Sequence, residues 1–358
     1  ALLIAYGEST LIGRVLATSP MTAIGRISYS LYLWHWPVIV FYRLNVDPHL
    51  TPSATALLVA VSFALAAASR HFVEMPFLRG LKAMPSRTVV AGGVASLAVV
   101  VIAALGVSWN ADNWRALPED VRHIASFADY RSRPEYQTQF RVGPCFAGES
   151  NAYDFEGCLK TVPGKRNIVV LGDSHAAQYW LAIAERFPDA NVMQATASGC
   201  RAVLPLQGQK RCTEVAERVL GPFVQSGAAD TLILAGRWTA SDVAKMGPTI
   251  DAVKPYVREV YVIGPTVEYE GEFPQLLARA MLRGNPDGVS DFRSQRQISI
   301  DDQLSKVVAA HGGRYISAID IECPEAKCRL TADGAPMQFD YGHLSLEGAR
   351  FVVGNMTF

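Results

Sequence analysis

The sequence predicts a transmembrane α-helical segment followed by an α/β/α three-layer domain with a parallel sheet. Two long stretches without charge, an alternation of short apolar runs with helical stretches after residue 166, and six cysteines confined to the second part indicate this fold class. The 358 residues are 50% hydrophobic and 18% charged, below the roughly 25% charge of ordinary soluble domains. The 33 basic residues balance 33 acidic ones, so the composition lacks the positive charge typical of nucleic-acid-binding proteins.

Three apolar stretches lie in the first 109 residues, which we assign to the membrane. Pro48 to Ser69 and Thr88 to Ala111 contain no charged residue, and a third stretch covers 24–42. A run of about 20 apolar residues has the length needed to cross a bilayer. In the third stretch, His35 stands mid-span between Trp34 and Trp36. An ionisable residue at that depth marks either a functional or lining position or a neighbour in an aromatic belt, and both interpretations stay open.

The basic residues predict how these spans are oriented. Four of them lie between the second and third spans, and two precede the first: Arg70, Arg79, Lys82 and Arg87, with Arg14 and Arg26. The loop at 45–53 has neither Lys nor Arg. By the positive-inside rule the basic loop is cytoplasmic, so the chain after the third span is expected on the far side of the membrane.

The first ten residues, ALLIAYGEST, have neither an initiator Met nor the basic region of a signal peptide. We interpret ALLIAYG as the end of an earlier span. We therefore expect a fragment of a larger membrane protein, with further N-terminal membrane helices as partners of this segment.

All six cysteines follow the last span, which is typical of disulfides in an oxidising compartment. Proximity along the chain favours three pairs, Cys145–Cys158, Cys200–Cys212 and Cys323–Cys328, although six cysteines allow other connectivities. The alternatives are buried thiols or a zinc site. The sequence has no CxxC pair, so we expect no metal.

After residue 109 the chain becomes polar, and 110–165 is predicted as an extension that packs on the following domain, with one helix near 118–130. From Asn167 onward short apolar runs alternate with amphipathic stretches, as expected of a parallel sheet covered on both faces. The predicted strands are 167–172, 191–196, 231–236, 260–264 and 314–319, and the predicted helices are 175–187, 212–226, 241–253, 271–283 and 296–310. In such a domain the active site lies at the carboxyl ends of the strands.

The first predicted strand runs directly into Gly172-Asp173-Ser174-His175. A Ser at a strand-to-helix junction presents its hydroxyl clear of the sheet, and its own N–H lies at a positive helix end that can stabilise an oxyanion. The alternative is that Asp173 or Ser174 only caps the helix. His175 begins that helix, where adjacent side chains diverge, so we expect its ring to point away from Ser174 and to serve packing or acceptor contact.

Near the end of the chain, Asp340-Tyr341-Gly342-His343 places a carboxylate and an imidazole three residues apart. On a turn they can face the same side, so that the carboxylate orients the imidazole and His343 acts as general base toward a Ser hydroxyl. A D-x-x-H pair alone also fits a surface contact. Its combination with a Ser after the first strand favours catalysis.

These motifs resemble known families. GDSH at 172–175 and DYGHLS at 340–345 resemble the first and last signature blocks of the SGNH hydrolase and transferase superfamily, which is flavodoxin-like in fold. GRISYSLYLWHWPVIVFYR at 25–43 and HFVEMPF at 71–77 resemble the closing transmembrane part of the acyltransferase-3 family. The order of these parts is similar to that of fused bacterial O-acetyltransferases. The resemblance divides the chain into incomplete membrane helices at 1–109, a periplasmic linker or extension at 110–165 and an SGNH catalytic domain at 166–358.

The resemblance also implies roles for single residues. Ser174 matches the nucleophile, His343 the general base and Asp340 the orienting acid. The N–H of Ser174 and that of Gly199, in Ala197-Ser198-Gly199-Cys200, match the oxyanion hole, although Gly199 also fits an ordinary turn. Where the superfamily pattern has Asn after a Gly, this chain has Arg237 after Gly236. A side-chain donor is therefore absent or supplied by Arg237.

The function implied by the resemblance is transfer of an acetyl group to a sugar hydroxyl of a bacterial surface glycan such as lipopolysaccharide O-antigen. The implied enzyme is an acyltransferase of the class that transfers groups other than amino-acyl groups. Acetyl-CoA is the implied ultimate donor, with no cofactor bound by this fragment. The implied location is the bacterial inner membrane, multi-pass in the lipid bilayer, with the SGNH domain in the periplasm. Two alternatives remain, a membrane-anchored glycan O-acetyl esterase and a non-catalytic glycan-holding domain.

Overall fold

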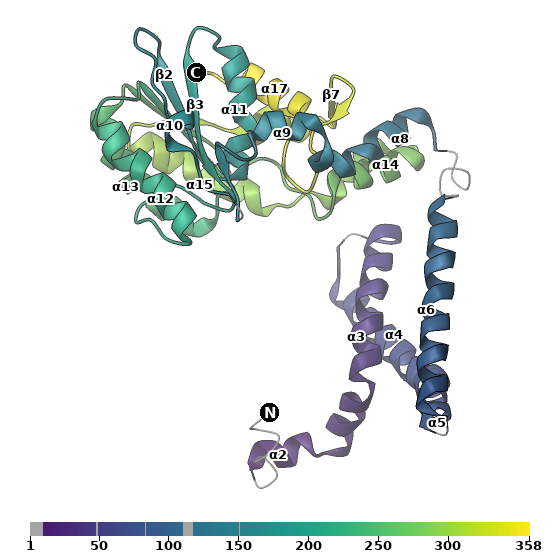
Figure 1. Cartoon of the computed structure of the whole chain (residues 1–358). Helices are drawn as coiled ribbons and strands as arrows, with labels where there is room; N and C mark the ends of the chain where they lie inside the picture. Colours follow the sequence, from purple (N-terminus) through teal and green to yellow (C-terminus); the bar gives the residue numbers. More distant parts are fainter. Residues whose placement is uncertain (1–9, 48, 83, 110–116, 150) are drawn as a thin grey trace. The chain divides into compact units, whose positions relative to one another are not determined.

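The computed structural model describes residues 10–47, 49–82, 84–109, 117–149 and 151–358. The chain separates into two compact units, with the division between Ala116 and Leu117. Each unit has its own set of helices, and the second also holds the sheet (Figure 1). The two units are therefore described separately.

The first unit is helical. Its elements are α2 (Leu11–Leu16), α3 (Ser19–Asn45), α4 (Pro52–Ser69), the π-helical turn η1 (Arg70–Glu74), α5 (Met75–Lys82) and α6 (Ser86–Trp109). The continuous helix Pro52–Gly80 and α6 are long and apolar enough to cross a membrane, which matches two of the three predicted spans. The remaining predicted span, 24–42, lies within α3, which packs against α4. Large apolar side chains of α6 are exposed, among them Leu97 and Ile102, as suits a helix that faces lipid.

The second unit is built on a six-stranded parallel sheet in the order β1-β3-β2-β4-β5-β6. The strands are β1 (Phe146–Ala147), β2 (Asn167–Gly172), β3 (Asn191–Ala197), β4 (Thr231–Ala235), β5 (Glu259–Ile263) and β6 (Arg314–Ile316). The five strands predicted from apolar runs are all present. The last is shorter than predicted because Ser317 caps a new helix, α16 (Ala318–Glu322). β1 was not predicted, since a two-residue strand leaves no periodic pattern.

Helices cover both faces of this sheet (Figure 1). They are α11 (Ser174–Arg186), α12 (Lys210–Arg218), α13 (Ala240–Val253), α15 (Arg296–Ala310) and α17 (Leu346–Asn355). A further helix, α14 (Phe273–Leu282), lies away from the sheet. α11 packs with α17, and α13 packs with α15. The predicted helix at 212–226 begins two residues earlier and changes to a π-helical turn, η3 (Val219–Phe223), where Gly221 and Pro222 interrupt the regular pattern. A short hairpin of β7 (Thr331–Ala332) and β8 (Ala335–Pro336) precedes α17.

The segment after the first unit packs on the second. The helix predicted near 118–130 is present as α8 (Glu119–Ala125) and the 3₁₀ helix η2 (Ser126–Ser132), followed by α9 (Pro134–Phe140) and α10 (Phe155–Cys158). α8 contacts α14, and α9 contacts α11 and α17. Aromatic side chains of this segment form one buried cluster with a residue from the end of the chain: Phe127, Tyr130, Phe140, Phe146 and Phe339. The segment is therefore part of the folded unit.

The three predicted disulfides are confirmed. Cys145 pairs with Cys158, Cys200 with Cys212, and Cys323 with Cys328. No free cysteine remains in the part of the chain that the structure describes. The alternatives of buried thiols or cysteine-bound zinc are thereby excluded.

Candidate active site

Ser174 is the first residue of α11, immediately beyond the carboxyl end of β2. Gly172 ends that strand with φ of +152°, and a Cβ there would lie 1.8 Å from the carbonyl oxygen of Ala235, so only glycine fits this approach of β2 to β4. Asp173 is the helix cap, because its carboxylate accepts the His175 N–H at 2.8 Å. The hydroxyl of Ser174 is thus free of the capping role and is directed elsewhere.

The structure brings Ser174 and His343 together across 169 positions of sequence. The Oγ of Ser174 lies 2.8 Å from Nε2 of His343. On the other side of the ring, Nδ1 lies 2.8 and 3.0 Å from the two carboxylate oxygens of Asp340. The backbone N–H groups of Gly342 and His343 donate to the same carboxylate at 3.0 and 2.8 Å. This is the relay that a serine nucleophile and a general base require.

Asp340 is held as a carboxylate. Burial raises its pKa, but the hydrogen bond and electrostatic effect of the His343 imidazole outweigh burial. Together with the two backbone N–H groups, they hold the pKa of Asp340 well below its ordinary value. Arg131 of η2 donates a further hydrogen bond to Asp340 at 2.9 Å. Sequence reasoning missed Arg131, because no local pattern relates two residues 209 positions apart.

His175 is buried, and its ring centroid lies 4.3 Å from that of His343. Its Nδ1 donates to the hydroxyl of Thr266 at 3.2 Å, since that hydroxyl itself donates to the Gly342 carbonyl. Burial, and secondarily the electrostatic effect of the adjacent His343 ring, lower the pKa of His175 well below its usual range, so it stays neutral. It packs behind the His343 ring, in agreement with the packing role expected from the sequence.

The donors predicted for an oxyanion hole lie beside Ser174. Gly199 has φ of +70° in the turn after β3, and it lines the same pocket as Ser174. Within the described part of the chain, neither the N–H of Gly199 nor that of Ser174 donates to another protein group. Both are therefore available to a developing oxyanion.

Arg237 occupies the position where the superfamily pattern has Asn, but its side chain is held by other contacts. Its backbone N–H donates to Asp173 at 3.0 Å, and its guanidinium forms a two-pronged ion pair with Glu268 at 2.7 and 2.9 Å. The guanidinium also stacks over the Tyr341 ring at 4.6 Å. The hydrogen bonds to Glu268 raise the pKa of Arg237 further above its ordinary value. The residue lines the pocket, but these contacts fix its side chain against Glu268.

The pocket around Ser174, called here the Ser174 pocket, has a volume of about 320 Å³. It lies at the carboxyl ends of the strands, where ligands bind in doubly wound sheets. Its lining combines the reacting groups with aromatic and basic side chains: Arg131, Tyr136, Phe140, Phe146, Asp173, Ser174, Ser198, Gly199, Arg201, Arg237, Phe339, Tyr341 and His343. A site of this size accommodates a small acyl group together with part of a sugar.

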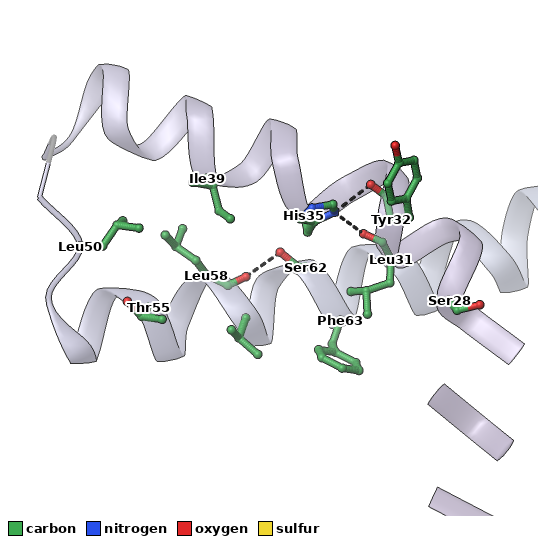
Figure 2. Close-up of a pocket in the computed structure, with 11 residues that line it drawn as sticks. Ser28, Leu31, Tyr32, His35, Ile39, Leu50, Thr55, Leu58, Ser62 and Phe63 are labelled. Atoms are coloured by element: carbon green, nitrogen blue, oxygen red, sulfur yellow. Dashed lines mark hydrogen bonds between the residues drawn. The ribbon is translucent and has the colours of Figure 1, made fainter. Parts of the chain in front are cut away.

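His35 lies in the first unit and lines a separate cavity of about 470 Å³ between α3 and α4 (Figure 2). Its Nδ1 donates to the backbone carbonyls of Leu31 and Tyr32, at 3.2 and 2.8 Å. The neighbouring Trp36 is exposed. His35 thus occupies a lining position on α3, one of the two interpretations left open by the sequence.

Comparison with known proteins agrees with this geometry. A family model described as "SGNH domain (fused to AT3 domains)" matches residues 144–357. The O-acetyltransferase OatA from Staphylococcus aureus strain NCTC 8325 is 35% identical over 82 residues, which are 22% of this chain and 14% of OatA. OatA from strain COL matches equally well. The chain therefore spans only a small part of these relatives.

A solved structure shares the fold. The periplasmic domain of a lipopolysaccharide acetyltransferase from Salmonella ser. Paratyphi A aligns with a TM-score of 0.56 and 21% identity, covering 65% of this chain and 97% of that domain. The family model covers more than half of the present sequence, including the Ser174, Asp340 and His343 positions. The chain therefore belongs to the family of SGNH domains that are fused to AT3 domains.

Proposed function

We propose that this protein is an O-acetyltransferase that moves an acetyl group to a sugar hydroxyl of a bacterial surface glycan, such as lipopolysaccharide O-antigen, through an acetyl-Ser174 intermediate. The observation that carries this proposal is the hydrogen-bonded series Ser174–His343–Asp340, whose first two members line the Ser174 pocket. Membership of a family fused to AT3 domains and the likeness to proteins named O-acetyltransferase support transfer over other acyl chemistry.

The first step is acylation of Ser174. Nε2 of His343 accepts the hydroxyl proton as Oγ attacks the acetyl carbonyl of the donor, and Asp340 stabilises the resulting imidazolium. The N–H groups of Ser174 and Gly199 donate to the oxyanion. The proton then passes from His343 to the leaving group. We propose cytoplasmic acetyl-CoA as the ultimate donor, with the membrane helices of the complete protein delivering the acetyl group.

The second step transfers the acetyl group to the acceptor. His343 removes the proton from a sugar hydroxyl, whose oxygen attacks the acetyl carbonyl and expels Oγ of Ser174, which takes the proton back. The same sequence with water as acceptor is esterase activity. Transfer therefore requires the acceptor to occupy the Ser174 pocket ahead of water.

We place the SGNH domain outside the cytoplasm, anchored to the inner membrane by a multi-pass helical segment. The three disulfides and the basic residues between the second and third spans support this placement. A non-catalytic glycan-holding role is less well supported, because the distances among Ser174, His343 and Asp340 are those of a working relay.

The test is the Ser174→Ala variant of the complete protein, with all of its membrane helices, expressed in cells that otherwise lack the gene. We expect O-acetyl signals in NMR spectra of the surface glycan with the native chain and none with the variant. Released acetate, measured in parallel, separates esterase from transferase. Undiminished glycan acetylation by Ser174→Ala would refute the proposed function.

A further inference from the structure

A second pocket of about 330 Å³ adjoins the Ser174 pocket. The two share Ser198, Gly199 and Arg201, so a ligand can extend from one into the other. We call it the Lys245 pocket. The rest of its lining comes from the loop before α12, the start of α12 and the first turns of α13: Val203, Pro205, Gln207, Gly208, Gln209, Arg211, Cys212, Ser241, Asp242 and Lys245.

The one acidic side chain of this lining is already neutralised. Asp242 forms an ion pair with Arg201 at 2.8 Å. The same carboxylate oxygen accepts the N–H and the hydroxyl of Thr239, at 2.9 and 2.6 Å, as the capping box of α13. Arg201 and Asp242 therefore cancel each other, and they leave no free negative charge to compensate other cations in the pocket.

Two cations of the lining have only neutral partners. Nζ of Lys245 donates to the side-chain amide oxygen of Gln207 at 3.2 Å. The guanidinium of Arg211 donates to the side chain of Gln209 and to the Ser198 carbonyl, and its Nε is buried without a partner. Among the residues that the structure describes, no carboxylate lies within ion-pair distance of Lys245 or Arg211. The pocket thus carries two uncompensated positive charges.

The helix dipole adds to this positive potential. α12 begins at the pocket with Gln209 as its N-cap, and Gln209 makes no side-chain capping bond. Lys210 and Arg211 occupy its first turn, which contains no acidic residue. Cations at the positive end of a helix are unfavourable. Lys245, Arg211 and the N-terminus of α12 therefore all contribute positive potential to the Lys245 pocket, which adjoins the Ser174 pocket.

We propose that the Lys245 pocket binds an anionic substituent, a carboxylate or a phosphate, on the acceptor saccharide. The neighbouring hydroxyl of that saccharide then lies in the Ser174 pocket for acetylation. This inference rests on the proposed function and adds the chemical class of the acceptor, an acidic glycan. Lys245 and Arg211 supply the charge, and the amide groups of Gln207 and Gln209 lie where they can bind sugar hydroxyls.

The test measures binding to the full chain in detergent micelles, with Ser174→Ala as background so that no turnover occurs. The carboxylate arm compares the trisaccharide of galacturonic acid with that of galactose. The phosphate arm compares glucose 6-phosphate with glucose. By isothermal titration calorimetry at low salt, we expect at least one anionic probe to bind about three- to fivefold more tightly than its neutral counterpart, with a smaller difference at high salt.

The variant is Lys245→Gln, and the matched control is Lys165→Gln, an exposed lysine just before β2 at the opposite end of the sheet. Lys245→Gln should remove most of the preference for the anionic probe, whereas Lys165→Gln should keep it. Arg211→Gln provides a second variant with the same expected loss. Equal affinity for anionic and neutral probes in both arms, or a preference that survives Lys245→Gln and Arg211→Gln, would overturn the inference.

The experiments test the acetyltransferase function and the acidic acceptor independently of each other. Binding in the Ser174→Ala background reports on the acceptor pocket whether or not the chain transfers acetyl groups. Conversely, acetylation of neutral glycans that depends on Ser174, with no preference in binding, would sustain the transferase and refute the acidic acceptor.

Discussion

The two adjoining pockets differ in how their charges are satisfied. In the Ser174 pocket each arginine of the lining is paired with a carboxylate: Arg131 with Asp340, Arg201 with Asp242 and Arg237 with Glu268. In the Lys245 pocket, whose lining also includes Arg201, the two other cations, Lys245 and Arg211, contact neutral groups.

This difference separates chemistry from recognition. A reacting relay must be held in one geometry before substrate arrives, and ion pairs with buried carboxylates hold it there. A surface that recognises a charged ligand instead keeps its charged side chains without ion-pair partners, so that the ligand neutralises them on binding. The following predictions test that division, beginning with the largest effect.

Asp340→Asn should have the largest effect, because it removes the charge that orients His343 and stabilises the imidazolium. We expect hydrolysis of 4-nitrophenyl acetate by the full chain to fall by about 10³- to 10⁴-fold. The matched control is Asp302→Asn, which removes an exposed ion pair with Lys306 on α15 and should retain full activity. Hydrolysis within threefold of the native rate would contradict the assignment of Asp340.

Cys200→Ser with Cys212→Ser removes the disulfide that joins the Gly199 turn to the first turn of α12. A disulfide that closes a loop of this length stabilises the folded state by about 3 kcal/mol, because it restricts the unfolded chain. We therefore expect the double variant to have a lower free energy of unfolding by about this amount and a lower thermal unfolding midpoint. The comparison pair, Cys323→Ser with Cys328→Ser, opens a shorter loop and should cost about 2 kcal/mol.

The same double variant also tests whether the Cys200–Cys212 disulfide positions the Lys245 pocket. Because α12 carries Arg211 and the disulfide holds its start beside Gly199, binding of anionic probes should weaken in Cys200→Ser/Cys212→Ser. It should stay intact in Cys323→Ser/Cys328→Ser. Equal loss in both variants would show that the disulfide does not position the Lys245 pocket.

Arg131→Gln tests whether a paired arginine tunes the relay. Arg131 shares Asp340 with His343, so its guanidinium helps to hold that carboxylate beside the imidazole. Without it, we expect the rate of 4-nitrophenyl acetate hydrolysis to fall by up to about tenfold, the cost of losing one hydrogen bond to a charged group.

Two further variants control this experiment. Arg131→Lys should restore much of the native rate, because an ammonium group can still donate to Asp340. Arg122→Gln, which removes an exposed arginine paired with Glu119, should leave the rate unchanged. Hydrolysis by Arg131→Gln at the native rate would show that Arg131 does not position the carboxylate.

Glu322, the buried last residue of α16, should give the smallest of these effects. Burial raises its pKa to about 8, against hydrogen bonds from the Val267 N–H and the Gln338 amide. Since the folded pKa exceeds the unfolded value, the folded state binds more protons between about pH 4.5 and 8, and stability falls as pH rises through that range.

We therefore expect the free energy of unfolding to drop by about 1 kcal/mol between pH 6 and pH 7 because of Glu322. Glu322→Gln should remove this part of the pH dependence, as measured by thermal unfolding at the two pH values. Glu214→Gln, at an exposed position of α12, should leave the pH dependence as it is in the native chain.

Some features could be predicted because their signal is local. The five longer strands leave continuous apolar runs, and the two parts of the relay lie in the short motifs at 172–175 and 340–343. The cysteine pairs are also neighbours along the chain. The strand β1 could not be predicted, because two residues are too few to show a periodic pattern. The change from α8 to the 3₁₀ helix η2 could not be predicted either, because segments of seven residues show too little periodicity to distinguish the two helix types.

The sequence by itself determined the order of a membrane part and an α/β domain, the Ser, His and Asp of the relay, and the disulfide pairs, because each depends on neighbours in the chain or on a motif. Only the tertiary structure decided that Arg131 reaches Asp340 and that the guanidinium of Arg237 pairs with Glu268. It also decided that, within the described residues, Lys245 and Arg211 have no carboxylate partner in the pocket next to that of Ser174. Such pairings join distant positions. They depend on how helices pack over the sheet edge, and no local pattern in the chain encodes them.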